Sequence, residues 1–224
     1  MVQALAIHLA VFGGIDQIKF LTFSTATQSC CAYFKLMVKL IAFCLLFCGN
    51  ITTAICQSHG SFSVWDIQEK RQIVLNQSKH SHSLFVFLSP ECPLCQNYSK
   101  TINELKIAFD GSLTIYGIVP GTSYADEDIM AFKEEYGLLF DLFIDKTFVL
   151  SQYFSISVTP EVVLLNKNGN KVYTGAIDNW VVSLGQKRNS ATVPYLKNAL
   201  TESLANQPIS VTYVQAIGCA LNDY

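Results

Sequence analysis

The sequence has little charge of either sign. Only 14% of its 224 residues are charged, and the formal net charge at pH 7 is −2. A protein that binds nucleic acid through its phosphates needs an excess of lysine and arginine, usually gathered on one face. The composition therefore gives no electrostatic case for a nucleic-acid partner.

Long apolar runs and repeats are also missing. The apolar run at residues 40–48 is nine residues long, and Lys35 and Lys39 interrupt any wider window around it. A membrane-spanning helix needs about 20 apolar residues. We find no internal repeat, low-complexity tract or heptad pattern. Half of the residues are nevertheless apolar, which is enough for the core of one domain with extensions.

Cysteine is abundant but unevenly placed. The chain has eight cysteines, and five of them lie in the first quarter: Cys30, Cys31, Cys44, Cys48 and Cys56. The part that looks globular keeps three: Cys92, Cys95 and Cys219.

A second methionine, Met37, opens a segment with the features of a secretory signal peptide. Lys39 supplies the positive charge, residues 40–48 the apolar stretch, and residues 54–56 a small-x-small cleavage site before Gln57. We expect export with cleavage near Cys56, and an uncleaved membrane anchor is the alternative.

These features divide the chain into four parts. We expect an upstream extension outside the mature protein at residues 1–36, a signal peptide at 37–56, a globular domain at 57–209, and a tail with Cys219 at 210–224.

One stretch organises the globular part. An apolar run at residues 84–88 predicts a buried strand, and Ser89-Pro90 predicts a turn. Cys92-Pro93-Leu94-Cys95 follows at the start of a predicted helix, with Pro93 at the first helical position, where its missing N–H costs nothing. The helical spacing comes from Leu94, Tyr98, Ile102, Leu105 and Phe109.

The two cysteines of this motif indicate dithiol–disulfide chemistry. The unpaired N–H groups and dipole of a helix N-terminus favour the reactive thiolate of Cys92. Cys95, one turn deeper, is near enough to close a disulfide with it. A structural zinc site would need about four ligands, and no second C-x-x-C motif or nearby Cys/His pair supplies the other two. A haem attachment site would need histidine at the position of Gln96. A structural disulfide closing so small a loop would stabilise little.

The remaining pattern predicts an α/β domain. The expected elements are short strands at 62–65 and 73–75, a strand at 113–119, a helix ending at Gly137, an apolar segment at 138–144, strands at 161–165 and 171–175 around Asn168-Gly169, and a helix at 192–205. The first half predicts parallel strands with crossover helices, and the second an antiparallel edge.

With Thr159-Pro160 ahead of the hairpin, this arrangement resembles the thioredoxin fold. It is similar to the redoxin branch, which includes AhpC/TSA-like peroxiredoxins and TlpA/ResA-like exported thiol–disulfide oxidoreductases. The segments 160–163, 173–180 and 216–219 also resemble a bacterial redoxin group. The resemblance implies a three-layer α/β fold, with a mixed central sheet, flanking helices and a C-terminal β-hairpin plus helix.

The resemblance also implies roles for individual residues. Pro160 would be a cis-proline beside the active-site cysteines, and the Thr159 backbone would pair with a substrate strand. Cys92 would attack a disulfide and Cys95 would resolve the mixed disulfide. No metal or organic cofactor is implied. The partners would be protein or small-molecule disulfides and a thiol electron donor, in the periplasm or cell envelope of a bacterium. A membrane would be involved only through an uncleaved signal segment.

A redoxin-type peroxidase is the first alternative. Peroxiredoxins place proline seven residues and Thr or Ser three residues before the attacking cysteine, and an arginine polarises the peroxide. Here Ser89 is present, Phe85 replaces the proline, and Arg188 is the only later arginine.

The second alternative is a non-catalytic module that binds copper or thiols. The two thiolates would act with His80 or His82, although a solvated strand entrance is the simpler explanation of these histidines. Glu91 and Ser89 are candidate auxiliary residues. Cys219 is a third redox cysteine, a cysteine for an external partner, or a small buried residue.

Overall fold

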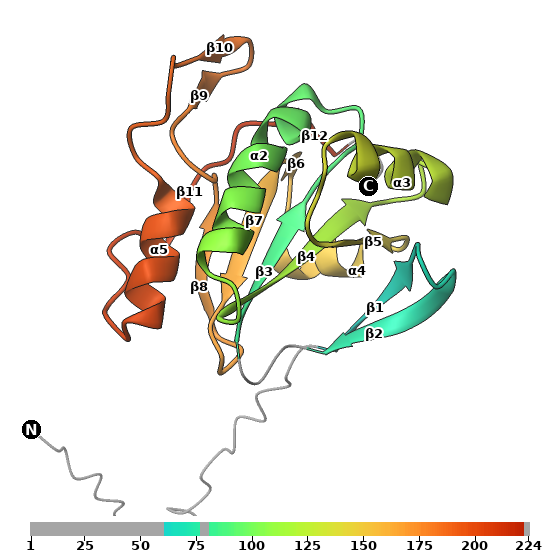
Figure 1. The fold of residues 1–224 in the computed structure, drawn as a ribbon, viewed down its shortest axis with the longest axis horizontal. Coiled ribbons are helices and arrows are strands. Elements are labelled where there is room, and N and C mark those ends of the chain that lie inside the picture. Colours follow the sequence, from blue (N-terminus) through green and yellow to red (C-terminus); the bar gives the residue numbers. More distant parts are fainter. Residues whose placement is uncertain (1–60, 77–80, 222–224) are drawn as a thin grey trace, which may run out of the picture. The chain divides into compact units, whose positions relative to one another are not determined.

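A computed structural model describes residues 61–76 and 81–221 (Figure 1). The predicted upstream extension, the predicted signal peptide and His80 lie outside the described residues. Among the described helices, none has the length and apolar character needed to cross a membrane.

An eight-stranded sheet forms the centre of the described residues, in the order β11-β8-β7-β3-β4-β5-β1-β2. Its strands are β1 (Ser61–Asp66), β2 (Arg71–Asn76), β3 (His82–Phe87), β4 (Leu113–Pro120), β5 (Asp141–Asp145), β7 (Glu161–Leu165), β8 (Lys171–Gly175) and β11 (Tyr213–Val214). Strands β3, β4 and β5 are parallel, whereas β7 runs antiparallel to β3, and β8 runs antiparallel to β7. This confirms the predicted parallel half and antiparallel edge.

The central strands are buried on both faces, as the apolar run of β3 illustrates. Leu84 and Val86 pack into one hydrophobic cluster, and Phe85 and Phe87 pack into a second cluster on the opposite face. Successive side chains of a strand point to opposite faces. A strand covered on both sides therefore reads as a continuous apolar run rather than an alternating one.

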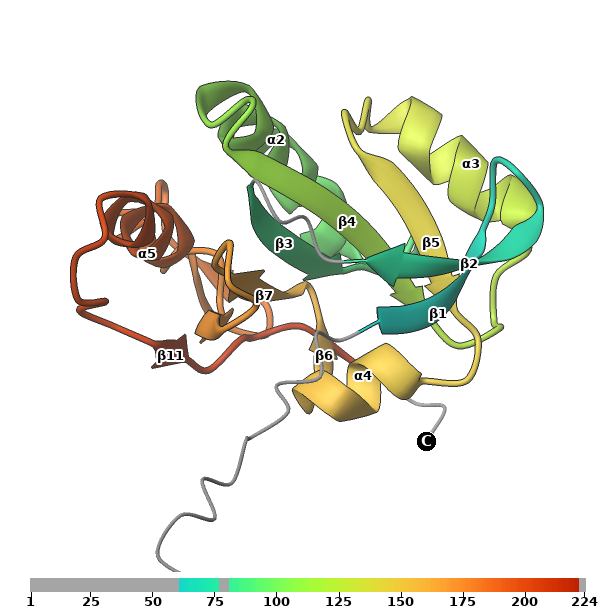
Figure 2. The same ribbon diagram turned by 90° about the horizontal axis from the view of Figure 1, so that it is seen from below.

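Helices cover both faces of the sheet (Figure 2). They are α2 (Pro93–Ala108), α3 (Asp126–Glu135), α4 (Val149–Phe154) and α5 (Tyr195–Leu204). Buried residues of α2, α3 and α5 belong to the first cluster, and those of α4 belong to the second. The result is the predicted three-layer α/β fold.

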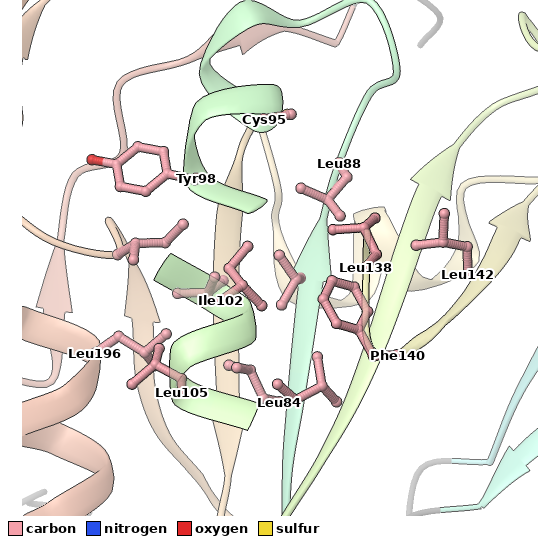
Figure 3. Packing of buried hydrophobic residues seen from close by; sticks show 14 of the residues in the cluster. Leu84, Leu88, Cys95, Tyr98, Ile102, Leu105, Leu138, Phe140, Leu142 and Leu196 are labelled. Carbon is pink, nitrogen blue, oxygen red and sulfur yellow. The ribbon is translucent and has the colours of Figure 1, made fainter. Parts of the chain in front are cut away.

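Helix α2 positions the site because its apolar face is packed against the sheet. Ile102 is fully buried and Leu105 is 5% exposed. Both lie between α2 and the strands, near Leu84 (Figure 3). The helix is therefore fixed along its length, and its N-terminus is held above the end of β3.

Two predictions at the C-terminal side differ from the structure in detail. Helix α5 begins at Tyr195, with Pro194 at the N-cap rather than inside the first turn. A small hairpin, β9 (Val181–Ser183) with β10 (Gln186–Lys187), was not predicted. It is largely exposed, so no buried apolar pattern marks it in the sequence.

Candidate active site

Cys92 occupies the N-cap of α2, and Pro93 is at the first helical position, as the sequence predicted. The turn after β3 is closed by the backbone N–H of Cys92, which donates to the Ser89 carbonyl at 3.1 Å. The Cys92 carbonyl in turn accepts from the backbone N–H of Gln96 at 3.1 Å. The sulfur is therefore set at the positive end of the helix dipole, which stabilises a thiolate.

The disulfide pairing differs from the prediction. Cys92 is bonded to Cys219, which is 127 residues away in the sequence, with 6.2 Å between the two Cα atoms. Cys95 is a free thiol. In this disulfide-bonded form, Cys92 is only 2% exposed. The sequence did not indicate this pairing, because local spacing points to the nearest cysteine and says nothing of where the tail returns.

The peptide bond between Thr159 and Pro160 is cis, as expected. The Thr159 carbonyl oxygen lies 3.2 Å from the Cys92 sulfur. A disulfide sulfur carries no hydrogen, so this is a close packing contact in the oxidised form. After reduction, the Cys92 thiol would be placed to donate to the same oxygen.

Cys95 lies in the first turn of α2 and is fully buried. Burial raises the pKa of its thiol to about 12. The backbone N–H of Ser89, 3.4 Å from the sulfur, and the hydroxyl of Thr159 act in the opposite direction but do not cancel the cost of burial. Cys95 is therefore a protonated thiol at neutral pH.

The tail reaches the site as a short strand. β12 (Cys219–Ala220) pairs antiparallel with β6 (Val158–Thr159), so that Cys219 lies opposite Thr159. The backbone N–H of Leu221 donates to the Ser157 carbonyl at 3.1 Å.

The auxiliary candidates Ser89 and Glu91 lie in the turn that precedes Cys92. Ser89 and Tyr124 hydroxyls are hydrogen-bonded at 2.8 Å, and the Tyr124 hydroxyl is 3.5 Å from a carboxylate oxygen of Glu91. Glu91 is exposed. Tyr124 was not singled out in the sequence, because nothing there shows that it faces Ser89.

A second tyrosine connects α2 to the loop after β8. The Tyr98 hydroxyl donates to Asp178 at 2.7 Å, and the same carboxylate oxygen accepts from the backbone N–H of Trp180 at 2.8 Å. Tyr98 and Asp178 also line a cavity of about 210 Å³ with Pro160 and Arg188. Sequence reasoning treated Tyr98 only as a helix-face residue, because its partner is 80 residues away.

In the described part of the chain, His82 does not lie with the cysteines in a cluster of possible copper ligands. His82 begins β3, whereas the cysteines follow the end of that strand. Its Nε2 is hydrogen-bonded to the Ser203 hydroxyl at 2.8 Å, and burial lowers its pKa. The expected solvated position is wrong for His82, which is 6% exposed. Residues 61–76 and 81–221 contain no group of three or more His, Cys, Asp or Glu arranged to hold a metal.

Comparisons with known proteins agree with this fold. The family model described as a thioredoxin-like domain matches residues 69–180, which is half of the chain. Similar solved structures include a hypothetical protein from Sinorhizobium meliloti, with 21% identity, a TM-score of 0.63, and coverage of 72% of this chain and 90% of that one. An uncharacterized conserved protein from Geobacillus kaustophilus has 18% identity, a TM-score of 0.62, and coverage of 72% and 88%.

None of the curated proteins matches the chain significantly. The two solved structures have a similar fold, and the match to the family model identifies the family. The chain is therefore a member of the thioredoxin-like domain family.

Proposed function

We propose that the chain is an exported thiol–disulfide oxidoreductase. One observation carries this proposal: Cys92 lies in a disulfide at the N-terminus of α2, against the Thr159 carbonyl, with the free thiol of Cys95 in the first turn of the helix. A disulfide at a helix N-terminus has a good leaving group, because the helix stabilises the departing thiolate.

The reaction follows from the two thiols. In the reduced protein, the Cys92 thiolate attacks one sulfur of a substrate disulfide, and the other substrate sulfur leaves as a thiolate that takes up a proton. Cys95 then loses its proton and attacks the Cys92 sulfur, which releases the second substrate thiol. The substrate has gained two electrons, and the protein holds the disulfide.

The protonation of Cys95 gives the steps an order. Its raised pKa keeps it neutral while Cys92 reacts, so the two thiolates do not repel each other. Cys92 is therefore the attacking residue and Cys95 the resolving one, as the resemblance implied.

Catalysed reduction of insulin disulfides by dithiothreitol tests the activity. We expect the wild-type protein to accelerate insulin precipitation and Cys92→Ser to abolish the acceleration. Lys100→Ala is the matched control, since Lys100 is exposed on the same helix. Wild-type protein that leaves the uncatalysed rate unchanged would refute the proposed activity.

Export is the second part of the proposal and rests on the segment 37–56. Mass spectrometry of the mature protein from its native host should give an N-terminus near Gln57. A mature protein that retains Met37 to Cys56 would favour an uncleaved anchor instead. The substrates would be disulfides of the periplasm or cell envelope, with a thiol donor in the same compartment.

A further inference from the structure

The C-terminal segment Ala216–Leu221, here called the tail segment, is bound at the site as a substrate would be. It is extended, adds a strand to β6, and carries a cysteine joined to the attacking Cys92. An extended polypeptide held by strand addition and by a mixed disulfide would make the same contacts.

We propose that Cys219 is a third redox-active residue of this site, and that the tail segment is a tethered substrate. The proposal rests on the proposed function, because it assigns Cys219 a place in the same exchange reaction. The segment holds the oxidised site closed until Cys95 or an incoming thiol displaces it.

Thr159 lies next to all three cysteines. Its carbonyl oxygen is 3.2 Å from the Cys92 sulfur, and its side chain acts to lower the pKa of the Cys95 thiol. Its backbone lies opposite Cys219 in the β6–β12 pair. A disulfide can therefore pass between the cysteines without a large movement of β6.

Gly218 shows that the tail segment fits closely against this loop. A Cβ atom at this position would overlap the Thr159 carbonyl group and would lie 3.2 Å from the Pro160 nitrogen. The obstructing atoms are backbone, so they cannot move aside as a flexible side chain would. Glycine is thus needed next to Cys219 for the segment to lie on the loop in this way.

The exchange step conserves atoms and electrons. The Cys95 thiol loses its proton, and its sulfur attacks the Cys92 sulfur. The bond between Cys92 and Cys219 breaks as the bond between Cys92 and Cys95 forms. Cys219 leaves as a thiolate and takes up a proton from solvent, so one disulfide replaces another without an external oxidant.

Exposure indicates how the tail segment leaves. Cys219 and Leu221 are partly exposed and Ala220 is exposed, whereas Cys92 is almost completely buried. Ala216 and Gly218 are buried, but the pairing of the segment with β6 is only two residues long and forms a separate two-stranded sheet, so the segment can detach without disturbing the central sheet.

A peptide supplied in trans tests the fit without risk to folding. The probe is a disulfide-linked dimer of the peptide corresponding to residues 215–221, and the acceptor is reduced Cys95→Ser/Cys219→Ser protein. We expect Cys92 to form a mixed disulfide with the peptide and release one peptide thiol. The same peptide carrying Gly218→Ala should react roughly tenfold more slowly or worse, because overpacking typically costs this much. A peptide carrying Ala220→Ser is the matched control and should react normally.

The full chain gives the second measurement. Wild-type protein equilibrated in graded glutathione buffers is quenched by alkylation, and its disulfides are mapped by mass spectrometry. We expect both Cys92–Cys219 and Cys92–Cys95 pairs, with Gly218→Ala shifting the ratio toward Cys92–Cys95 by about tenfold or more. Ala220→Ser should leave the ratio unchanged.

The two experiments distinguish a wrong role for the tail segment from a wrong activity of the protein. If Cys92 reacts equally with all three peptides and with oxidised glutathione, the activity stands but the tail segment is not a substrate mimic. A Cys92–Cys219 pair that never exchanges with Cys95 would make Cys219 a structural residue and overturn the inference. If Cys92 reacts with no disulfide at all, both proposals fail.

Discussion

The chemistry of the site depends on two cysteines at the start of α2 that are both buried in the first hydrophobic cluster but differ in position and bonding. Cys92 caps the helix and is joined to Cys219, whereas Cys95 lies inside the first turn as a free thiol. Burial disfavours the charged thiolate, and so it raises the pKa of Cys95 to about 12. The resolving thiol is therefore kept inactive until a mixed disulfide forms beside it.

This environment predicts the pH dependence of Cys95 labelling. In protein with the Cys92–Cys219 disulfide intact, the rate of alkylation by iodoacetamide should rise about tenfold per pH unit from pH 7 to 11, because the pKa of the thiol is about 12. A thiol with the unshifted pKa of 9.0 would be half ionised at pH 9, and its rate would level off above about pH 10. Labelling sites and rates can be followed by mass spectrometry. A plateau above about pH 10 would contradict the buried, protonated thiol.

The sequence identifies some of these residues better than others. The roles of Cys92 and Pro93 follow from local rules, because a helix start needs only the neighbouring residues. Pro160 was found through its resemblance to a family motif. The pairing of Cys219 with Cys92 depends on a tail that returns across the molecule, and no local pattern encodes that return.

At the scale of elements, α2 is held at two places. Its apolar face packs on the sheet, and its first half is tied to the loop after β8 through Tyr98 and Asp178. Asp178 is 8% exposed and accepts from Tyr98 and from the backbone of Trp180. The ring of Trp180 packs edge-on against Tyr98. The N-terminus of α2 is thereby fixed relative to the antiparallel edge.

Removal of the Tyr98 hydroxyl should loosen this connection. Tyr98→Phe takes away a hydrogen bond to a buried carboxylate, and we expect the free energy of unfolding to fall by about 1–3 kcal/mol. Urea denaturation followed by circular dichroism measures the change. Tyr213→Phe is the control, because Tyr213 is 59% exposed, and it should have little effect. Equal stability of the two variants would show that the Tyr98–Asp178 bond contributes nothing.

The predictability of each element follows its burial. β3, β4 and β7 were found because they are apolar runs buried on both faces. β6 and β12 have only two residues each, too few for any periodic pattern. Yet β6 and β12 bring Thr159 opposite Cys219. Beside β3 and α2, which were predicted, the chemistry therefore depends on two short strands that the sequence does not reveal.

At the scale of the whole described domain, the site lies where distant parts of the chain meet. The end of β3, the loop before β7 and the tail after β11 all reach the N-terminus of α2. Such an arrangement suits disulfide exchange, because a rigid helix end faces a segment that can be displaced.

The same arrangement argues against efficient peroxide reduction. Phe85 faces the second cluster, away from Cys92, and the Ser89 hydroxyl is hydrogen-bonded to Tyr124. Arg188 is exposed and lines the cavity beside Pro160. In peroxide reduction, hydrogen-bond donors stabilise the charge that develops on the leaving oxygen. Loss of one such donor typically lowers the rate by about 10²–10³.

We therefore expect slow oxidation of the reduced protein by hydrogen peroxide. Stopped-flow fluorescence of the reduced protein gives the rate constant directly. A value on the order of 10⁷ M⁻¹s⁻¹ or more, typical of very efficient enzymes, would instead identify a peroxidase.

The central claim is that the disulfide of Cys92 is reactive rather than structural, and its reduction potential tests this most directly. Equilibration of the protein with graded redox buffers, followed by alkylation and mass spectrometry, gives the potential. We predict a value between about −270 and −120 mV, the range of thiol–disulfide oxidoreductases. A potential below about −300 mV, typical of structural disulfides in secreted proteins, would contradict the account.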